Sequence, residues 1–435
     1  MDKPPEAVEN YLETIFMLGY GGNRVRSVDI ANEMEYSKPT ISVAMKNLRA
    51  SGYIAVDENG HITLTESGSE IAGRMYERHK LISDWLMFLG VSNETAVSDA
   101  CKIEHDISEE SFAALQRHIM DKAFKLDSDK SPAAAHEEIP AQSHLEFITK
   151  EQVFSVLPPR SKNSHKGVHG RLLNISGSLR YRGAATLSCL GALRSGVGLM
   201  VLASTEAVCE AVAHQLPEVI FCPLPASKSG NICSRNLTAY IGKELAFAKA
   251  VLIGCGLGDG VLTGKILEYV LANAKCPIVI DADGLNALSR NICMIKKTTV
   301  PIVLTPHPGE MSRLCGVSTA TIEKDRSGFA ERFASEHGVV LVLKGHRTVI
   351  ALPSGELRIN QTGNPGLAKG GSGDVLAGMI ASFIAQGLSA ADASTCGVFL
   401  HGLASDQTAK RRGEYAMLPS EIVIDLAKIM AENGR

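Results

Sequence analysis

The sequence predicts a chain of two differently built parts, an α-rich first part and an α/β second part with a mainly parallel sheet. In the first 125 residues, apolar side chains recur at helical spacing. From about residue 171 onward, short apolar runs alternate with helical stretches, which is typical of a parallel sheet covered by helices on both faces. The chain has 40 glycines, and most of them follow residue 165.

Length and composition indicate a soluble protein of more than one domain. The chain has 435 residues and a net charge of −3, so it has no general attraction to nucleic acid or anionic membranes. It lacks a run of about 18 apolar residues and a signal-peptide core, so we expect no membrane association. The ten cysteines are scattered singly, as is typical of reduced thiols in the cytoplasm.

Residues 1–65 are predicted to form a winged helix-turn-helix. Helical spacing over 5–18 is followed by two short helices, capped by Ser27 and by Ser37, and then by two short strands joined at Asn59-Gly60. The helix from Ser37 would enter the DNA major groove. A protein-interaction role is the alternative, because acids slightly outnumber bases over residues 1–80. The candidate DNA contacts are Ser37, Lys38, Thr40, Ser42 and Lys46.

Three further helices are expected over 66–89, 96–107 and 111–125. In the second of them, Cys101, Glu104 and His105 share one helix face, and their ligand types suit a divalent transition metal. The alternative is a helix with an incidental buried cysteine. We therefore predict metal-binding and dimerisation helices over 66–125, a polar linker with two prolines over 126–148, and a catalytic domain over 149–435.

The first part resembles the diphtheria toxin repressor and manganese transport regulator family of metal-dependent repressors. The resemblance rests on Tyr11-Leu12-Glu13-Thr14-Ile15, Arg78-His79-Lys80-Leu81 and Cys101-Lys102-Ile103-Glu104-His105. It implies Fe²⁺ or Mn²⁺ binding, a homodimer and double-stranded operator DNA. Asn10 stands where relatives have Met or Asp, so the identity of the metal stays open. The ligands implied by the resemblance are Glu13, His79, Cys101, Glu104 and His105.

In the second part, strands are expected over 172–175, 199–203, 250–253, 277–280, 302–304 and 339–343, with helices such as 184–195, 264–274 and 325–336 between them. Ligands of such sheets bind at the carboxyl ends of the strands. Four motifs stand at those ends: Gly254–Gly260, Asp281–Asn286, Thr305–Glu310 and Lys344–Thr348. The first fails the dinucleotide-binding spacing because Asp259 stands where the third glycine belongs.

A glycine-rich loop that runs into an apolar helix is the strongest single signal. Gly370, Gly371 and Gly373 allow consecutive backbone N–H groups to approach an anion such as phosphate, and the helix start adds a partial positive charge. Asp374 then suits the role of a base that takes a proton from a substrate hydroxyl. The alternative is an ordinary stabilising aspartate in the first turn of a helix.

Taken together, these motifs resemble the ADP- or ATP-dependent NAD(P)H-hydrate dehydratases of the ribokinase-like fold, over about residues 150–435. The resemblance implies repair of hydrated NADH or NADPH (NADHX or NADPHX) by phosphorylation of the ring hydroxyl and phosphate elimination, with Mg²⁺ and with ADP or ATP as donor. Asp374 would be the base. The implied hydrate contacts are Ala184, Gly258, His307 and Asp374; the nucleotide contacts are Lys344, Gly345, His346, Arg347, Thr348 and Gly373; the anion hole is Gly370, Gly371, Ser372 and Gly373.

Two alternatives stay open at this point. The second part could be a ribokinase-like small-molecule kinase whose phosphorylated product is stable. The chain could also be a metal-dependent transcriptional repressor whose second part only senses a nucleotide.

Overall fold

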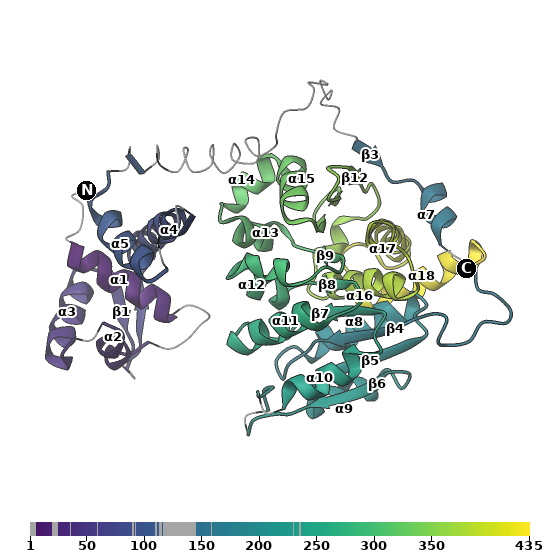
Figure 1. Cartoon of the computed structure of the whole chain (residues 1–435), viewed down its shortest axis with the longest axis horizontal. Helices are drawn as coiled ribbons and strands as arrows, with labels where there is room; N and C mark the ends of the chain where they lie inside the picture. The colour runs from purple at the N-terminus through teal and green to yellow at the C-terminus, as the bar shows by residue number, and fades with distance from the viewer. Residues whose placement is uncertain are drawn as a thin grey trace. The chain divides into compact units, whose positions relative to one another are not determined.

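A computed structural model describes residues 6–19, 25–34, 36–58, 60–88, 91, 93–108, 111–112, 115, 145–157, 159–228, 230–234 and 236–435 (Figure 1). Its internal contacts divide the chain into a first unit, Met1–Ile139, and a second unit, Pro140–Arg435. None of the described helices combines the length and the apolar character that crossing a membrane requires.

The first unit has the predicted winged helix-turn-helix layout. Its elements are α1 (Glu6–Gly19), α2 (Ser27–Glu33), α3 (Lys38–Ala50), β1 (Ile54–Val56), β2 (Ile62–Leu64), α4 (Glu66–Phe88) and α5 (Asn93–Asp106). The strands β1 and β2 pair antiparallel, and Leu12, Ile30 and Ile41 are buried in one core between the helices. Most of the helix predicted over 111–125 lies outside the described residues.

The caps of the short helices follow from local side chains. The Ser37 hydroxyl accepts a hydrogen bond from the Thr40 N–H at 3.4 Å, so Ser37 caps α3 as predicted. The prediction that Ser27 caps α2 is wrong by one residue, because Arg26 occupies the cap position and its N–H donates to the Asp29 carboxylate at 2.8 Å.

The second unit is built on one ten-stranded sheet in the order β3-β12-β11-β10-β9-β8-β7-β4-β5-β6. All neighbouring strands run parallel except at β11, which pairs antiparallel with β10 and β12. The mainly parallel sheet is therefore confirmed. The strands are β3 (Leu145–Phe147), β4 (Arg171–Ile175), β5 (Leu199–Thr205), β6 (Ile220–Leu224), β7 (Ala250–Ile253), β8 (Ile278–Ile280), β9 (Ile302–Leu304), β10 (Val340–Leu343), β11 (Val349–Ala351) and β12 (Leu357–Ile359).

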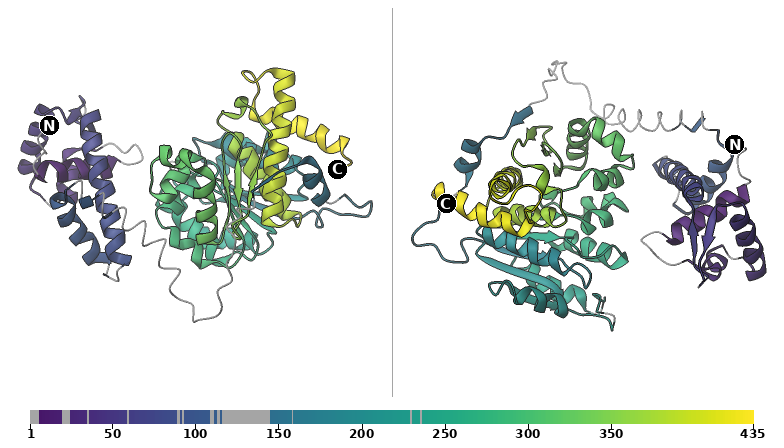
Figure 2. Two further views of the ribbon diagram at one scale, coloured as in Figure 1. Left: turned by 90° about the horizontal axis from the view of Figure 1, so that it is seen from above. Right: turned by 180° about the vertical axis from the view of Figure 1, so that it is seen from behind.

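Helices cover both faces of this sheet (Figure 2). Alternate strand residues point to opposite faces, so Leu172 and Leu252 join the core with α8, α16 and α17, whereas Leu173 and Val251 join the core with α10, α11 and α15. The helices are α7 (Lys150–Val156), α8 (Arg182–Arg194), α9 (Glu206–Ala213), α10 (Leu237–Leu245), α11 (Val261–Asn273), α12 (Asp283–Ser289), α13 (Pro308–Cys315), α14 (Thr319–Lys324), α15 (Arg326–His337), α16 (Ser372–Ala385), α17 (Ala390–Arg412) and α18 (Pro419–Glu432), with the 3₁₀ turns η1 (Ile292–Lys297) and η2 (Pro365–Leu367).

The strand order places a topological switch point between β4 and β7. The chain runs from β4 through β5 to β6 in one direction, and then returns to β7, beside β4, and continues in the other direction to β10. At the carboxyl ends of these two strands, the Gly177 N–H donates to the Cys255 carbonyl at 2.8 Å. Sheets of this kind bind their ligands in the crevice at such a point.

Helix α16 is held rigidly behind the switch point. Every residue from Val375 to Ala385 is buried. A Cβ on Gly191 of α8 would collide with the Val375 carbonyl, and one on Gly378 of α16 would collide with the Ser188 carbonyl. The two helix backbones therefore touch, and this contact fixes the start of α16, where Asp374 lies.

Candidate active site

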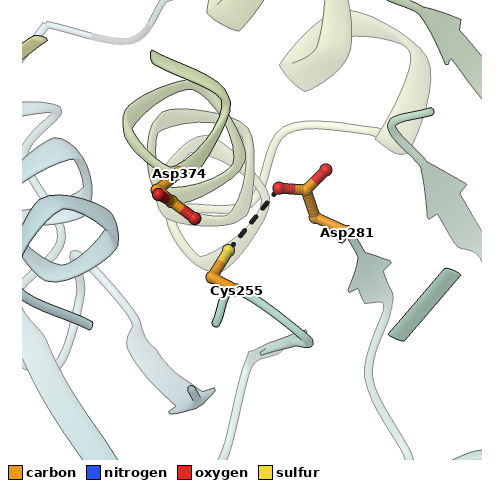
Figure 3. A group of neighbouring side chains, drawn as sticks. All are labelled: Cys255, Asp281 and Asp374. Carbon is orange, nitrogen blue, oxygen red and sulfur yellow. Dashed lines mark hydrogen bonds between the residues drawn. The ribbon is translucent and has the colours of Figure 1, made fainter. Parts of the chain in front are cut away.

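Four chemically active side chains converge at the carboxyl ends of the strands. Cys255 follows β7, Asp281 follows β8, and Asp374 lies in the first turn of α16 (Figure 3). Lys344 follows β10. The Lys344 ammonium lies 2.8 Å from Asp281 Oδ1, and the Thr305 hydroxyl donates to the same oxygen at 2.7 Å. Burial alone would lower the pKa of Lys344, but Asp281 and Glu310 outweigh it and raise that pKa, so Lys344 is a permanent cation.

The Asp374 carboxyl titrates near neutrality. Burial raises the pKa of Asp374 to about 7, and the charges of Asp281 and Asp283 act in the same direction, whereas Cys255 and Lys344 act against it. A carboxylate with a pKa close to the working pH combines useful basicity with a large ionised fraction. The site therefore supplies a base of the kind that the sequence predicted at this position.

The glycine loop brings open backbone next to the Lys344 cation. Gly371 has a φ of +100° and caps α16, a conformation that favours glycine. A Cβ on Gly370 would meet no described atom within 4 Å, whereas one on Gly373 would lie 3.2 Å from the Lys344 ammonium. The start of α16 and Lys344 thus offer positive charge at one place, which suits a phosphoryl group. The Ser372 hydroxyl is buried and bonds to no described residue.

His307 is held in a single tautomer. Its Nδ1 accepts hydrogen bonds from the Gly309 and Glu310 N–H groups at 3.0 and 3.3 Å. Burial and the charges of Lys344 and Arg313 lower the pKa of His307, so the ring is neutral and carries its proton on Nε2. Because its side chain is 52% exposed, His307 can donate that proton in a hydrogen bond to a ligand.

A strained turn separates the two carboxylates of the Asp281–Asn286 motif. Ala282 has a φ of 49° and a ψ of −116°. The side chains on either side of it bond to different residues. Asp281 faces Lys344, while Asp283 Oδ2 accepts the Gly258 N–H at 2.8 Å. The predicted hydrate contacts Ala184 and Gly258 both lie at the switch point. Ala184 Cβ would be 2.7 Å from a Cβ on Gly256, in the same glycine-rich turn as Gly258.

The predicted nucleotide loop, Lys344–Thr348, is held by a residue that the sequence did not indicate. Arg326, the first residue of α15, donates to the carbonyls of Leu343 and His346 at 3.0 and 2.6 Å. Arg347 has a φ of 55° within this loop. Nothing in the local sequence marks Arg326, because its partners are backbone carbonyls distant along the chain.

In the first unit, the described side chains that were predicted to contact DNA are exposed to solvent. Thr40, Ser42 and Lys46 are exposed on α3, opposite its buried residues Ile41 and Met45. Ser37 is exposed as well, although its hydroxyl is partly engaged in the helix cap. The Lys38 side chain lies outside the described residues.

The predicted metal ligands are distributed over helices α1, α4 and α5. Glu13 on α1 is buried, His79 on α4 is half-buried and Cys101 on α5 is exposed. The side chains of Glu104 and His105 lie outside the described residues. The sequence did not indicate Glu9, which is a fully buried carboxylate one helical turn before Glu13. Among the described side chains, the only group of metal-ligand types that converges is Cys255, Asp281 and Asp374, in the second unit.

Comparison with known proteins identifies the families that the two units resemble. Residues 172–428, more than half of the chain, match the family model for NAD(P)H-hydrate dehydratase. The chain belongs to the NAD(P)H-hydrate dehydratase family. Its second unit has the ribokinase-like fold, because a ribokinase-like superfamily protein from Enterococcus faecalis V583 superposes on 68% of the chain with a TM-score of 0.60 and 30% identity.

The second unit is similar in sequence and structure to enzymes from Bacillus subtilis and Moorella thermoacetica. The ADP-dependent (S)-NAD(P)H-hydrate dehydratase of Bacillus subtilis is 35% identical over 279 residues, which are 64% of this chain and 95% of that protein. A crystal structure of the ADP/ATP-dependent enzyme from B. subtilis, co-crystallised with ATP and Mg²⁺, has a TM-score of 0.58 at 34% identity and covers 66% of this chain and 98% of its own. The bifunctional NAD(P)H-hydrate repair enzyme of Moorella thermoacetica is 41% identical over 277 residues, and this chain spans only 52% of its length.

The first unit of this family member matches two further models. Residues 5–62 match the iron dependent repressor N-terminal DNA binding domain, and residues 65–133 match the iron dependent repressor metal binding and dimerisation domain. The chain therefore combines a domain of the NAD(P)H-hydrate dehydratase family with segments that match the iron dependent repressor models.

Proposed function

We propose that the second unit repairs hydrated NADH and NADPH at the expense of ADP or ATP. The observation that carries this proposal is the position of Asp374. A carboxyl with a pKa of about 7 lies in the first turn of α16, directly after the glycine loop and close to Lys344. Transfer of a phosphoryl group to a hydroxyl requires a base beside the phosphoryl site, and this position of Asp374 supports that role.

The proposed reaction has two steps. Asp374 takes the proton of the ring hydroxyl while the hydroxyl oxygen attacks the terminal phosphorus of the nucleotide, which leaves AMP or ADP. The phosphorylated hydrate then loses inorganic phosphate and a ring proton, and the ring double bond is restored. The backbone N–H groups of Gly370–Gly373 and the Lys344 ammonium stabilise the charge on the transferring group.

The remaining predicted residues orient the two substrates. The Nε2–H of His307 and the backbone at Ala184 and Gly258 hold the hydrate at the switch point. The loop Lys344–Thr348, held by Arg326, binds the nucleotide together with Gly373. In this arrangement the hydroxyl lies between Asp374 and the phosphoryl site, and water is kept from competing with it.

Mg²⁺ is proposed to enter with the nucleotide. Mg²⁺ takes oxygen ligands, but the convergent group of the second unit includes the Cys255 thiol, and Asp281 is already paired with Lys344. These residues do not fit a Mg²⁺ site of their own. The proposal follows the B. subtilis relative, which was co-crystallised with ATP and Mg²⁺.

The test is an assay of the full chain with NADHX, Mg²⁺ and either ADP or ATP. Recovery of the near-ultraviolet absorbance of NADH with at least one donor is expected, and Cys101→Ala, altered in the first unit, should behave as the unmodified protein. Absence of recovery with both donors would remove the repair proposal. A phosphorylated product that accumulates without phosphate release would instead favour the small-molecule kinase.

We also propose that the first unit binds double-stranded operator DNA as a metal-dependent homodimer. Its support is the exposed polar surface of α3, with Thr40, Ser42 and Lys46 on the face opposite the core. A donor set of carboxylate, imidazole and thiol suits Fe²⁺ or Mn²⁺. The ligands in this proposal are Glu13, His79, Cys101, Glu104 and His105.

Selection from a pool of random-sequence DNA duplexes tests this second proposal. With Mn²⁺, the full chain should enrich a palindromic sequence and have the mass of a dimer in light scattering; with a chelator, both effects should be lost. Lys46→Ala should weaken binding to the selected duplex, whereas Lys265→Ala, an exposed lysine on α11, should not. Enrichment that is equal with and without metal would contradict metal dependence.

A further inference from the structure

The thiol of Cys255 occupies an unusual position in the proposed active site. It follows β7 at the switch point, and its side chain is fully buried. Its Sγ lies 3.6 Å from Asp281 Oδ2, and the ligand atoms of Cys255, Asp281 and Asp374 all lie within 4.8 Å of one another (Figure 3). The sequence indicated no role for Cys255 itself within this turn, and the proposed mechanism does not use the thiol.

The surroundings of Cys255 exclude the roles that a reactive cysteine usually has. Burial and the neighbouring carboxylates of Asp281 and Asp374 raise the pKa of the Cys255 thiol well above its usual range. The thiol is therefore protonated at neutral pH, and a buried, protonated thiol is a poor nucleophile. What it offers is one S–H donor directed at two carboxylates.

We propose that Cys255 is a positioning residue for the base: its S–H donor is shared between the Asp281 and Asp374 carboxylates and holds Asp374 toward the substrate hydroxyl. One thiol proton serves one carboxylate at a time. In this structure the Cys255 Sγ donates to Asp281 Oδ2 at 3.6 Å, and a carboxylate oxygen of Asp374 lies within 4.8 Å of the same sulfur. Thr305 and Lys344 both donate to Asp281 Oδ1, so the Asp281 carboxylate is stabilised by two donors besides the thiol on its Oδ2. This inference rests on the proposed role of Asp374 as base.

Among the described residues, the charged groups that act on Asp374 directly or through Lys344 come from the ends of neighbouring elements. Asp281 follows β8, Asp283 starts α12, Lys344 follows β10, and Glu310 on α13 lies 3.7 Å from the Lys344 ammonium. Of these, only Lys344 is a cation. The cation is paired with Asp281 at 2.8 Å, and the Cys255 thiol adds a neutral donor that favours the ionised form of Asp374.

The test compares Cys255→Ala and Cys255→Ser with the unmodified full chain in the hydrate-repair assay, as a function of pH. Loss of a hydrogen bond of ordinary strength should move the acid limb of kcat/KM upward by about 0.5 to 1 pH unit in Cys255→Ala. Below the limb, kcat/KM should fall about threefold to tenfold, with KM for the nucleotide unchanged. The serine hydroxyl is a better donor than a thiol, so the limb of Cys255→Ser should stay in place or move downward.

Cys189→Ala is the matched control. Cys189 is a fully buried thiol on α8, and its Sγ accepts a hydrogen bond from the Asn174 amide at 3.4 Å, outside the cluster around Asp374. Its substitution removes the same atoms from the core and should leave the limb in place. A limb that is the same in Cys255→Ala and the unmodified protein, or an equal shift in Cys189→Ala, would overturn the proposal.

A second readout does not depend on turnover. In protein with ¹³C-labelled aspartate carboxyl groups, the Asp374 resonance is assigned by its absence from Asp374→Asn, and its titration is followed in each variant. The Asp374 titration should move upward in Cys255→Ala and not in Cys255→Ser. If the unmodified protein does not repair NADHX, the repair proposal fails while this titration still decides the role of Cys255. If the alanine variant does not fold, a serine variant whose Asp374 titrates above that of the unmodified protein refutes the role.

Discussion

Replacing Asp374 with asparagine is expected to lower turnover and to stabilise the second unit at the same time. Turnover falls because a general base contributes about 10²- to 10⁴-fold to the rate of proton transfer. Stability rises because burial and neighbouring carboxylates raise the pKa of Asp374 from 3.8 to about 7, which makes its ionised form costly in the folded protein. A difference of about 3 pKa units corresponds to up to about 4 kcal/mol.

The gain in stability depends on pH with a definite sign. Below the unfolded pKa of 3.8, Asp374 is neutral in the folded and the unfolded state, so it does not lower the free energy of unfolding. Between pH 3.8 and about 7 the unfolded chain is ionised at this carboxyl while the folded protein keeps the proton, so the unmodified protein loses stability across this window, and the loss is complete above about pH 7. The variant should therefore match the unmodified protein at about pH 4 and exceed it at about pH 8.

Calorimetric unfolding of the full chain measures this difference. The only tryptophan of the chain is Trp85, on α4 of the first unit, so its fluorescence identifies the transition of that unit and the other transition belongs to the second unit. The transition of the second unit should move to higher temperature in Asp374→Asn at about pH 8, and the transition reported by Trp85 should not move. A variant that is no more stable at high pH, or one that retains turnover, would refute the reasoning.

Three other substitutions test the geometry of the site. Ala282→Gly should stabilise the second unit by about 1 kcal/mol, because glycine adopts the observed φ of 49° without strain; a fall in its unfolding temperature would contradict this. Arg326→Ala should raise KM for the nucleotide about tenfold or more and leave KM for the hydrate unchanged, since its guanidinium holds the loop Lys344–Thr348 to the end of β10; equal changes in both constants would point to general unfolding. Gly373→Ala should lower kcat about tenfold or more, because its Cβ would lie 3.2 Å from the Lys344 ammonium, whereas Gly264→Ala, whose Cβ meets no described atom within 4 Å, should leave kcat unchanged.

Strongly patterned elements could be predicted from the sequence. The strands over 250–253 and 302–304 match β7 and β9 residue for residue, because continuous apolar runs between polar turns mark buried parallel strands. The strands β11 and β12 gave no such signal. They have three residues each, Arg358 interrupts β12, and their pairing is set by contacts along the sheet rather than by local sequence.

Helix α17 shows a second kind of element that sequence periodicity does not predict. It has 23 residues, but its buried face consists largely of small side chains such as Ala393, Ser394 and Gly397. Without large apolar residues at helical spacing, periodicity cannot separate the buried face from the exposed one. The helix becomes evident only when its packing against α16 and α18 is seen.

In the site, the sequence indicated the residues but not their partners. Asp374 and His307 stand in motifs whose local chemistry is readable, since a glycine loop and two flanking prolines restrict the backbone around them. The contacts of Cys255 and Arg326 depend on how distant strand ends meet, and no local pattern contains that information. The same holds for the pKa of Asp374, which is set by burial and by Asp281 from another strand.

The most direct test of the repair proposal is the stoichiometry of the reaction with NADHX and ADP. For every NADH restored, one AMP and one inorganic phosphate should be released, with the products separated by chromatography, and Asp374→Asn should release neither. NADH that forms without AMP and phosphate, or AMP that forms together with a stable phosphorylated hydrate, would contradict phosphorylation followed by elimination at this site.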